Sequence, residues 1–300
     1  MVERSPEEAG VGGSIPSRGT NVQNISKKSI GVFDSGFGGL AILKEIKKEL
    51  PEYDYLYLGD TARAPYGSRA KEEIYTFTEE GVRFLFEQGA ELVVLACNSS
   101  SSDALRKLQQ EYIPQKFPSK KVLGVLIPAA EEAIEKTRNK KVGLIATEAT
   151  ITSSSFRREL KKLDREVKIF ERACPELVPL VETGDTDSEK TKEVLNVYLE
   201  PLKEGEIDTL ILGCTHYEFL EKNIKEIMGE GVLVISEGAV ISDKLKKYLD
   251  KHTEIKDKLS RDGERVFFTT GFKEKFDSQG GIFFGEKIES QEIAISSKIS

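Results

Sequence analysis

The feature that most constrains the fold is a regular alternation of short apolar runs with longer amphipathic segments between residues 29 and 288. Several runs, such as 92–96 and 210–212, are almost continuously apolar, which is typical of strands buried on both faces of a parallel sheet. The predicted strands are 29–34, 53–58, 91–96, 121–127, 141–146, 167–170, 207–213, 231–236 and 266–270. The predicted helices between them include 38–50, 70–88, 188–203 and 239–250. This alternation predicts an α/β fold with mostly parallel sheets.

Composition excludes several classes of protein. The chain has 300 residues, a net charge of -7 and a pI of about 5.3, which argues against nucleic acid or an anionic membrane as the main partner. No run of 18 apolar residues is present, so we expect no membrane-spanning helix. Residues 1–28 lack the apolar region of a secretory signal and are expected to form a disordered tail, and residues 289–300 to form a polar C-terminal tail.

Cysteine and histidine are scarce. Three cysteines are an odd number and few for a chain of this length, so a disulfide framework is not expected, which favours a reducing, cytoplasmic location. The two histidines and three cysteines have no metal-binding spacing, so we expect no metal site.

A repeated pattern of strand and cysteine organises the chain. Residues 91–96 precede Cys97 and residues 208–213 precede Cys214, and in both cases an acidic residue opens a buried strand and polar residues follow the thiol. Because open α/β sheets bind ligands at the carboxyl ends of their strands, we expect the two cysteines to meet at one site. The pattern predicts two similar three-layer domains, 29–126 plus 236–288 and 127–235, with the active site in the cleft between them.

Each of these cysteines has a chemical and a purely structural interpretation. A thiol at the start of a helix is stabilised as thiolate by the helix dipole, whereas a lone buried cysteine is often an inert apolar side chain. Two cysteines in matching contexts favour the chemical interpretation, while Cys174 lacks a nearby base and is expected to be structural. His216 near Cys214 and Asp34 at the end of the first strand could exchange protons with the thiols, although both could equally be helix caps.

The polar residues around these positions suit a small amino acid. The glycine-rich turn 34–39 matches no nucleotide-binding motif and could hold an anion on its backbone N–H groups. Asn98, Ser99, Thr215 and the turn 65–67 add short donors for a carboxylate and an ammonium group. Two thiols on opposite sides of an α-carbon could remove its proton and return one, which is the chemistry of racemisation without a cofactor.

Six segments of the chain, in order, resemble glutamate racemases. They are GVFDSGFGGL at 31–40, DTARAPYG at 60–67, ACNS at 96–99, VGLIATEAT at 142–150, ACPELVP at 173–179 and GCTHY at 213–217. The resemblance implies that Cys97 is the base for D-glutamate and Cys214 the base for L-glutamate, with Asp34, His216 and Glu182 assisting. It also implies a set of residues that contact the substrate. These are Asp34, Ser35, Pro65, Tyr66, Gly67, Asn98, Ser99, Thr147, Thr215 and His216.

The resemblance further implies that the product D-glutamate supplies peptidoglycan synthesis, and it leaves a homodimer open. The chain departs from the family pattern at Ser99 (usually Thr), Glu218 (usually Pro) and Phe37 (usually Val), and none of these changes removes a catalytic group. Three alternatives remain: a racemase of aspartate or another amino acid, a thiol redox sensor in which Cys97 and Cys214 form a disulfide, and a ligand-binding module on the same fold.

Overall fold

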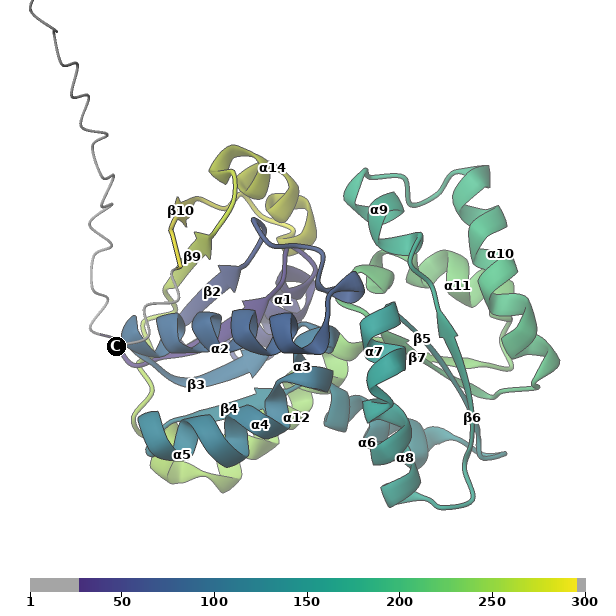
Figure 1. Cartoon of the computed structure of the whole chain (residues 1–300), viewed down its shortest axis with the longest axis horizontal. Helices are drawn as coiled ribbons and strands as arrows, with labels where there is room; N and C mark the ends of the chain where they lie inside the picture. Colours follow the sequence, from purple (N-terminus) through teal and green to yellow (C-terminus); the bar gives the residue numbers. More distant parts are fainter. Residues whose placement is uncertain (1–26, 296–300) are drawn as a thin grey trace, which may run out of the picture.

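The computed structural model describes residues 27–295 and contains two sheets, in which every strand pairs parallel to its neighbours. The first sheet has the strand order β10-β9-β2-β1-β3-β4 and the second the order β6-β5-β7-β8 (Figure 1). The strands are β1 (Ser29–Asp34), β2 (Tyr55–Gly59), β3 (Ala90–Leu95), β4 (Lys121–Gly124), β5 (Lys141–Ala146), β6 (Lys168–Ala173), β7 (Thr209–Gly213), β8 (Leu233–Ile235), β9 (Arg265–Thr269) and β10 (Ser290–Glu292). The predicted α/β class with mostly parallel sheets is confirmed.

Helices fill the connections between the strands. They are α1 (Gly39–Glu49), η1 (Tyr66–Ser68), α2 (Lys71–Glu87), α3 (Asn98–Asp103), α4 (Leu105–Lys107), η2 (Leu108–Tyr112), α5 (Ile113–Lys116), α6 (Leu126–Lys136), α7 (Glu148–Ser153), α8 (Ser155–Leu163), α9 (Leu177–Glu182), α10 (Glu189–Glu204), η3 (Thr215–Leu220), α11 (Glu221–Met228), α12 (Glu237–Lys251), α13 (Thr253–Lys256) and α14 (Lys273–Phe284). Among residues 27–295, no helix is both long and apolar enough to cross a membrane.

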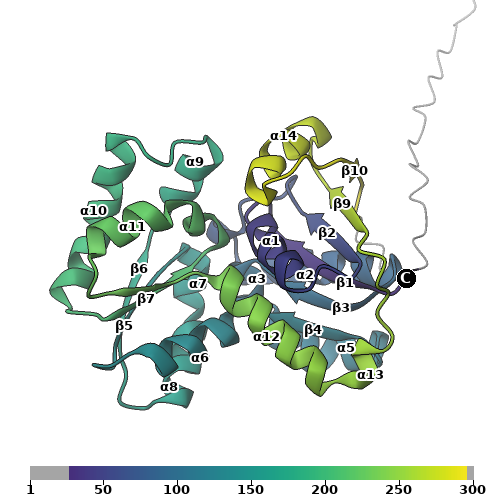
Figure 2. The same ribbon diagram turned by 180° about the vertical axis from the view of Figure 1, so that it is seen from behind.

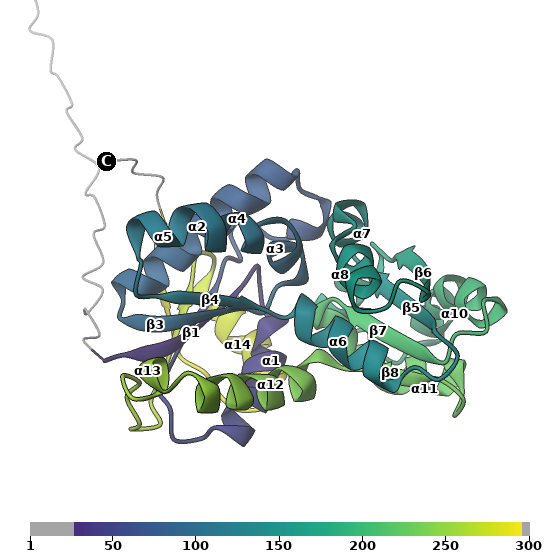
Figure 3. The same cartoon turned by 90° about the horizontal axis from the view of Figure 1, so that it is seen from below.

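The first sheet is covered on both faces because side chains alternate along each of its strands. Ile30 and Val32 of β1 pack with α1, α12 and α14, while Phe33 packs with α2 on the other face. Figure 3 shows α2, α4 and α5 on one side of this sheet and α1 and α12 on the other. Burial on both faces explains why these strands read as continuous apolar runs in the sequence.

The second sheet is built in the same way. Leu144 of β5 faces a cluster formed with α6 and α8, and Ile145 faces the opposite cluster formed with α10 and α11. The chain passes between the sheets twice, from β4 into α6 and from β8 into α12, and α12 then packs along α1 (Figure 2). The predicted domain boundaries after residues 126 and 235 stay a prediction.

Three predictions made from the sequence need correction. The strand predicted at 121–127 ends at Gly124 and α6 begins at Leu126, because an apolar run does not by itself distinguish a buried strand from a buried helix. The predicted C-terminal tail 289–300 contains β10, which pairs with β9, and Ile293 after it is only 5% exposed. Lys27 forms ion pairs with Asp262 and Glu264, so the predicted N-terminal tail does not extend through residue 27; residues 1–26 lie outside the described part.

Candidate active site

The carboxyl ends of four strands bring the chemistry together. Cys97 follows β3 and Cys214 follows β7, and the neighbouring strands β1 and β5 end at Asp34 and before Thr147. Side chains at the carboxyl ends of adjacent parallel strands meet at one edge of the sheet, which is where open α/β sheets bind ligands. The edges of the two sheets face each other across a cavity of about 590 Å³.

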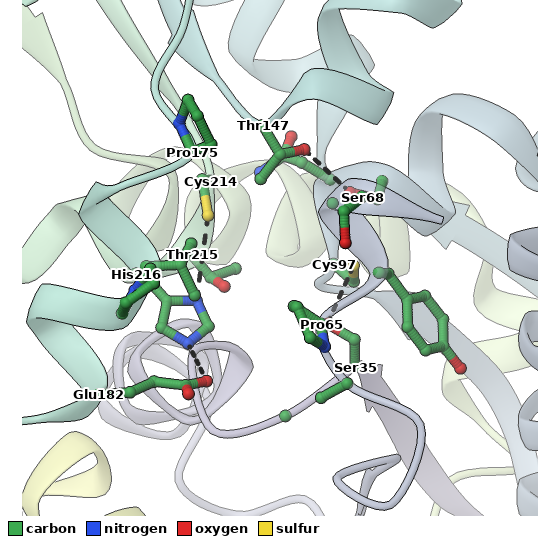
Figure 4. Close-up of a pocket in the computed structure, with 18 of the residues that line it drawn as sticks. Ser35, Pro65, Ser68, Cys97, Thr147, Pro175, Glu182, Cys214, Thr215 and His216 are labelled. Atoms are coloured by element: carbon green, nitrogen blue, oxygen red, sulfur yellow. Dashed lines mark hydrogen bonds and ion pairs between the residues drawn. The ribbon is translucent and has the colours of Figure 1, made fainter. Parts of the chain in front are cut away.

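Both cysteines line this cavity, as Figure 4 shows, and each thiol enters it from a different sheet. Cys97 is 6% exposed and its thiol donates to the Ser35 hydroxyl at 3.5 Å. Cys214 is 7% exposed and its sulfur lies 3.9 Å from Nδ1 of His216. All three cysteines of the chain, including the fully buried Cys174, are free thiols.

Burial controls the acidity of the two thiols. It raises the pKa of Cys97 above its ordinary value, and repulsion by the buried carboxyl of Asp34 adds to the effect. Burial also raises the pKa of Cys214 well above its ordinary value, against the opposing hydrogen bond from the backbone N–H of His216. A thiol with a raised pKa is neutral at rest, and once deprotonated it is a stronger base than an exposed cysteine.

His216 connects Cys214 to a carboxylate. Its Nε2 lies 3.4 Å from Oε1 of Glu182, the last residue of α9, so the imidazole stands between the thiol and the carboxylate (Figure 4). The contact with His216 holds the pKa of Glu182 below its ordinary value. Glu182 is held in turn from the first-sheet side, because Nε2 of Gln279 in α14 donates to its carbonyl oxygen at 3.0 Å. The geometry suits proton exchange between the His216 ring and Cys214.

Most residues predicted to contact a substrate do line the cavity. They are Ser35, Pro65, Tyr66, Gly67, Asn98, Ser99, Thr147, Thr215 and His216. Asp34 is the exception: its side chain is buried beneath the turn that follows it, where Oδ1 accepts the N–H of Gly36 at 2.8 Å. Asp34 therefore lies behind the turn and is not part of the cavity wall.

Two glycines allow the walls to approach each other closely. A Cβ on Gly38 would lie 2.1 Å from Oγ1 of Thr215 and 2.8 Å from Nδ1 of His216, and one on Gly67 would lie 2.7 Å from Cβ of Thr147. The first contact joins the turn after β1 to the Cys214 segment, and the second joins η1 to the end of β5. Only residues without a side chain permit this spacing.

Part of the cavity wall was not predicted from the sequence. Lys275 and Gln279 come from α14, and Glu148, Val178 and Thr183 come from α7, α9 and the turn after α9. The helix at 273–284 gave no clear signal, because its segment Asp-Ser-Gln-Gly-Gly is weakly helical. Within residues 27–295, no group of three or more His, Cys, Asp or Glu side chains is arranged to hold a metal ion.

Comparison with known proteins gives a consistent result. Residues 30–242 match the model of the family Asp/Glu/Hydantoin racemase. The glutamate racemase of Thermoanaerobacter pseudethanolicus is 39% identical over 266 residues, which cover 89% of this chain and 97% of that protein.

Two solved structures are similar over almost the whole chain. Glutamate racemase isoform RacE1 from Bacillus anthracis has a TM-score of 0.83 and 36% identity, covering 90% of this chain and 98% of the other. Glutamate racemase from Francisella tularensis in complex with D-glutamate has a TM-score of 0.81 and 28% identity, with coverage of 91% and 99%. The resemblance predicted from the six sequence segments is thereby confirmed, and the chain belongs to the Asp/Glu/Hydantoin racemase family.

Proposed function

We propose that this protein interconverts L-glutamate and D-glutamate without a cofactor, using Cys97 and Cys214 as the two proton-transfer groups. The observation that carries the proposal is the presence of both thiols in one cavity, each entering from the end of a different sheet. Glutamate is favoured as the substrate because the similar proteins named above are glutamate racemases. The D-glutamate formed would serve peptidoglycan synthesis in the cytoplasm.

The reaction needs one base and one acid on opposite faces of the α-carbon. With D-glutamate bound, the Cys97 thiolate takes the α-proton while the Cys214 thiol gives its proton to the other face, so that L-glutamate, a Cys97 thiol and a Cys214 thiolate result. The L-to-D direction reverses both transfers. His216, 3.9 Å from the Cys214 sulfur, can hold the proton that Cys214 gains or loses between turnovers, and Glu182 orients its ring.

The remaining groups of the cavity wall bind the substrate and exclude water. The hydroxyls of Ser99 and Thr147 lie 3.1 Å apart and can donate to a carboxylate, as can the backbone of the Gly67 turn. Thr215 and Asn98 lie beside the two thiols. The developing carbanion is stabilised by these fixed donors in a buried space, where electrostatic interactions are stronger than in water.

Circular dichroism on pure protein with L- or D-glutamate tests the proposal directly. The circular dichroism of either enantiomer should decay to zero without added cofactor, and the α-proton should exchange for deuterium in deuterated water. Cys97→Ala and Cys214→Ala should each lower racemisation by at least about 10²-fold, the usual worth of a general acid or base.

Cys174→Ala is the matched control, because Cys174 is buried, has a pKa raised by burial to about 12 and does not line the cavity. Full activity of Cys97→Ala in both directions would rule out the two-thiol mechanism. Faster turnover of L-aspartate than of L-glutamate at equal concentration would replace the proposed substrate.

A further inference from the structure

A buried carboxyl group stands next to the cavity without forming part of its wall. Glu237 is the first residue of α12 and its side chain is fully buried. Its Oε2 accepts a hydrogen bond from Nδ2 of Asn98 at 2.7 Å, and its Oε1 has no partner among residues 27–295. Burying a carboxyl with so few partners costs stability, so this arrangement calls for another reason than holding the fold together.

The partner of Glu237 belongs to the cavity. Asn98 follows Cys97 directly, lines the cavity and is 3% exposed. Its Nδ2 is held by Glu237, whereas its Oδ1 is buried and has no hydrogen-bond partner within the described residues. An amide fixed in this way has its carbonyl oxygen left to accept a hydrogen bond from a ligand.

The neighbouring carboxyl groups favour a cationic donor at this position. Asp34 and Glu237 are buried and Glu218 is partly buried, and loss of solvation raises the pKa of each carboxyl group above its ordinary value. Repulsion from Glu218 and Asp34 also raises the pKa of Glu237. An ammonium group bound on this side of the cavity would favour the ionised form of these carboxyl groups, whereas a ligand carboxylate would disfavour it further.

The start of α12 is itself fixed to the segment that carries the second thiol. Oε1 of Glu218, four residues after Cys214, accepts the backbone N–H of Gly238 at 2.8 Å. The first turn of α12 therefore contacts the residue after Cys97 through Glu237 and the segment after Cys214 through Gly238. This double contact leaves little freedom for the carboxyl group that holds Asn98.

We infer that Glu237 is a positioning residue of the active site, which holds the Asn98 amide so that Oδ1 accepts a hydrogen bond from the α-ammonium group of an amino-acid substrate. The inference rests on the proposed racemase function and deepens it, because it assigns the side of the cavity that recognises the amino group. Glu237 does not touch the substrate and acts only through Asn98.

The test compares two ligands that differ in the amino group alone. D-glutamate and glutarate carry the same two carboxylates, but glutarate has no ammonium group, and the apparent Kd of each is measured by calorimetry. Glu237→Met keeps the size of the side chain and removes the acceptor. It should weaken D-glutamate binding roughly tenfold, as expected for a hydrogen bond to a charged group, and change glutarate binding less than about twofold. Glu237→Gln retains an oxygen that accepts from Nδ2 and should bind D-glutamate as the wild type does.

A matched control separates this effect from a loosened helix. Ser242→Ala alters an uncharged buried side chain of the same helix, which donates to the carbonyl oxygen of Ala239 and does not touch Asn98, so it should change the Kd of both ligands by the same factor. The inference is overturned if Glu237→Met weakens both ligands equally or neither, and Glu237→Ala gives the same comparison should the Met variant fail to fold. Failure of the wild type to racemise glutamate would count against the proposed function, and the two binding constants would still decide the role of Glu237.

Discussion

Replacing Gly38 with alanine tests how far the site depends on the close approach of its two walls. Gly38 has φ −55° and ψ −40°, a conformation that alanine adopts readily. The smaller entropy of the unfolded chain alone would therefore stabilise the variant by about 0.4–1 kcal/mol. The added Cβ, however, would lie 2.1 Å from Oγ1 of Thr215 and 2.8 Å from Nδ1 of His216.

The size of the clash decides whether Gly38→Ala is more or less stable than the wild type. Overpacking a tight site costs about 1–3 kcal/mol, which exceeds the entropic gain, so a net loss of about 1–2 kcal/mol in the free energy of unfolding is expected. To restore a contact of 3.0 Å, Thr215 must move by about 1 Å, and a displacement of that size can cost about 10²-fold in rate. The larger consequence should therefore be catalytic.

Two measurements are needed, urea unfolding for stability and circular dichroism for the rate of glutamate racemisation. Gly36→Ala serves as the stability control in the same turn, because the nearest atom to its Cβ would be Oδ1 of Asp34 at 4.0 Å. A Gly38→Ala protein with the stability and the rate of the wild type would refute the argument that this contact sets the geometry of the Cys214 segment.

Two further predictions concern a partly buried carboxyl group and a hydroxyl of the cavity wall. Burial raises the pKa of Glu218 from 4.5 to about 7, so its stabilisation of the folded state is complete below about pH 4.5 and is lost as the pH rises through 7. The free energy of unfolding in urea should fall between pH 5 and pH 8, and Glu218→Gln should remove up to about 3 kcal/mol of that fall. Equal pH dependence of the wild type and the variant would contradict the burial effect. Thr147→Val should raise the KM for glutamate about tenfold, because it removes a donor to a carboxylate. The same variant should lose about 1 kcal/mol of stability, because Oγ1 of Thr147 also caps α7 by accepting the N–H of Thr150. Thr147→Ser should retain both properties in kinetic and unfolding assays, and an equal rise in KM for the two variants would mean that the hydroxyl is not a ligand.

Strand-and-cysteine segments could be predicted from the sequence because parallel strands buried on both faces leave a strong apolar signal. β1 and β5 have the predicted bounds, and Cys97 and Cys214 follow β3 and β7 as expected. Elements whose conformation depends on distant contacts gave no such signal. β10 is a polar strand of three residues that exists through its pairing with β9, and β6 at the edge of its sheet extends to Ala173 rather than residue 170.

The residues of the cavity wall likewise fall into those that the sequence predicts and those that it does not. Residues next to the cysteines, such as Asn98 and Thr215, were found because they follow a recognisable strand. Lys275 and Gln279 were missed because α14 reaches the site only through tertiary packing, and Glu237 was missed because a carboxylate in the first turn of a helix is ordinarily a surface residue. The burial of Asp34 depends on the path of the turn after β1, which its sequence leaves open.

The shielding of the two cavity thiols also bears on damage by oxygen. Peroxides attack the anionic form of sulfur, and a cysteine that keeps its proton is a slow substrate for conversion to sulfenic and higher acids. Cys97 and Cys214 combine raised pKa values with little exposure, which is the reverse of what an oxidant sensor requires. The same enclosure that raises the pKa of each sulfur is therefore expected to slow its oxidation.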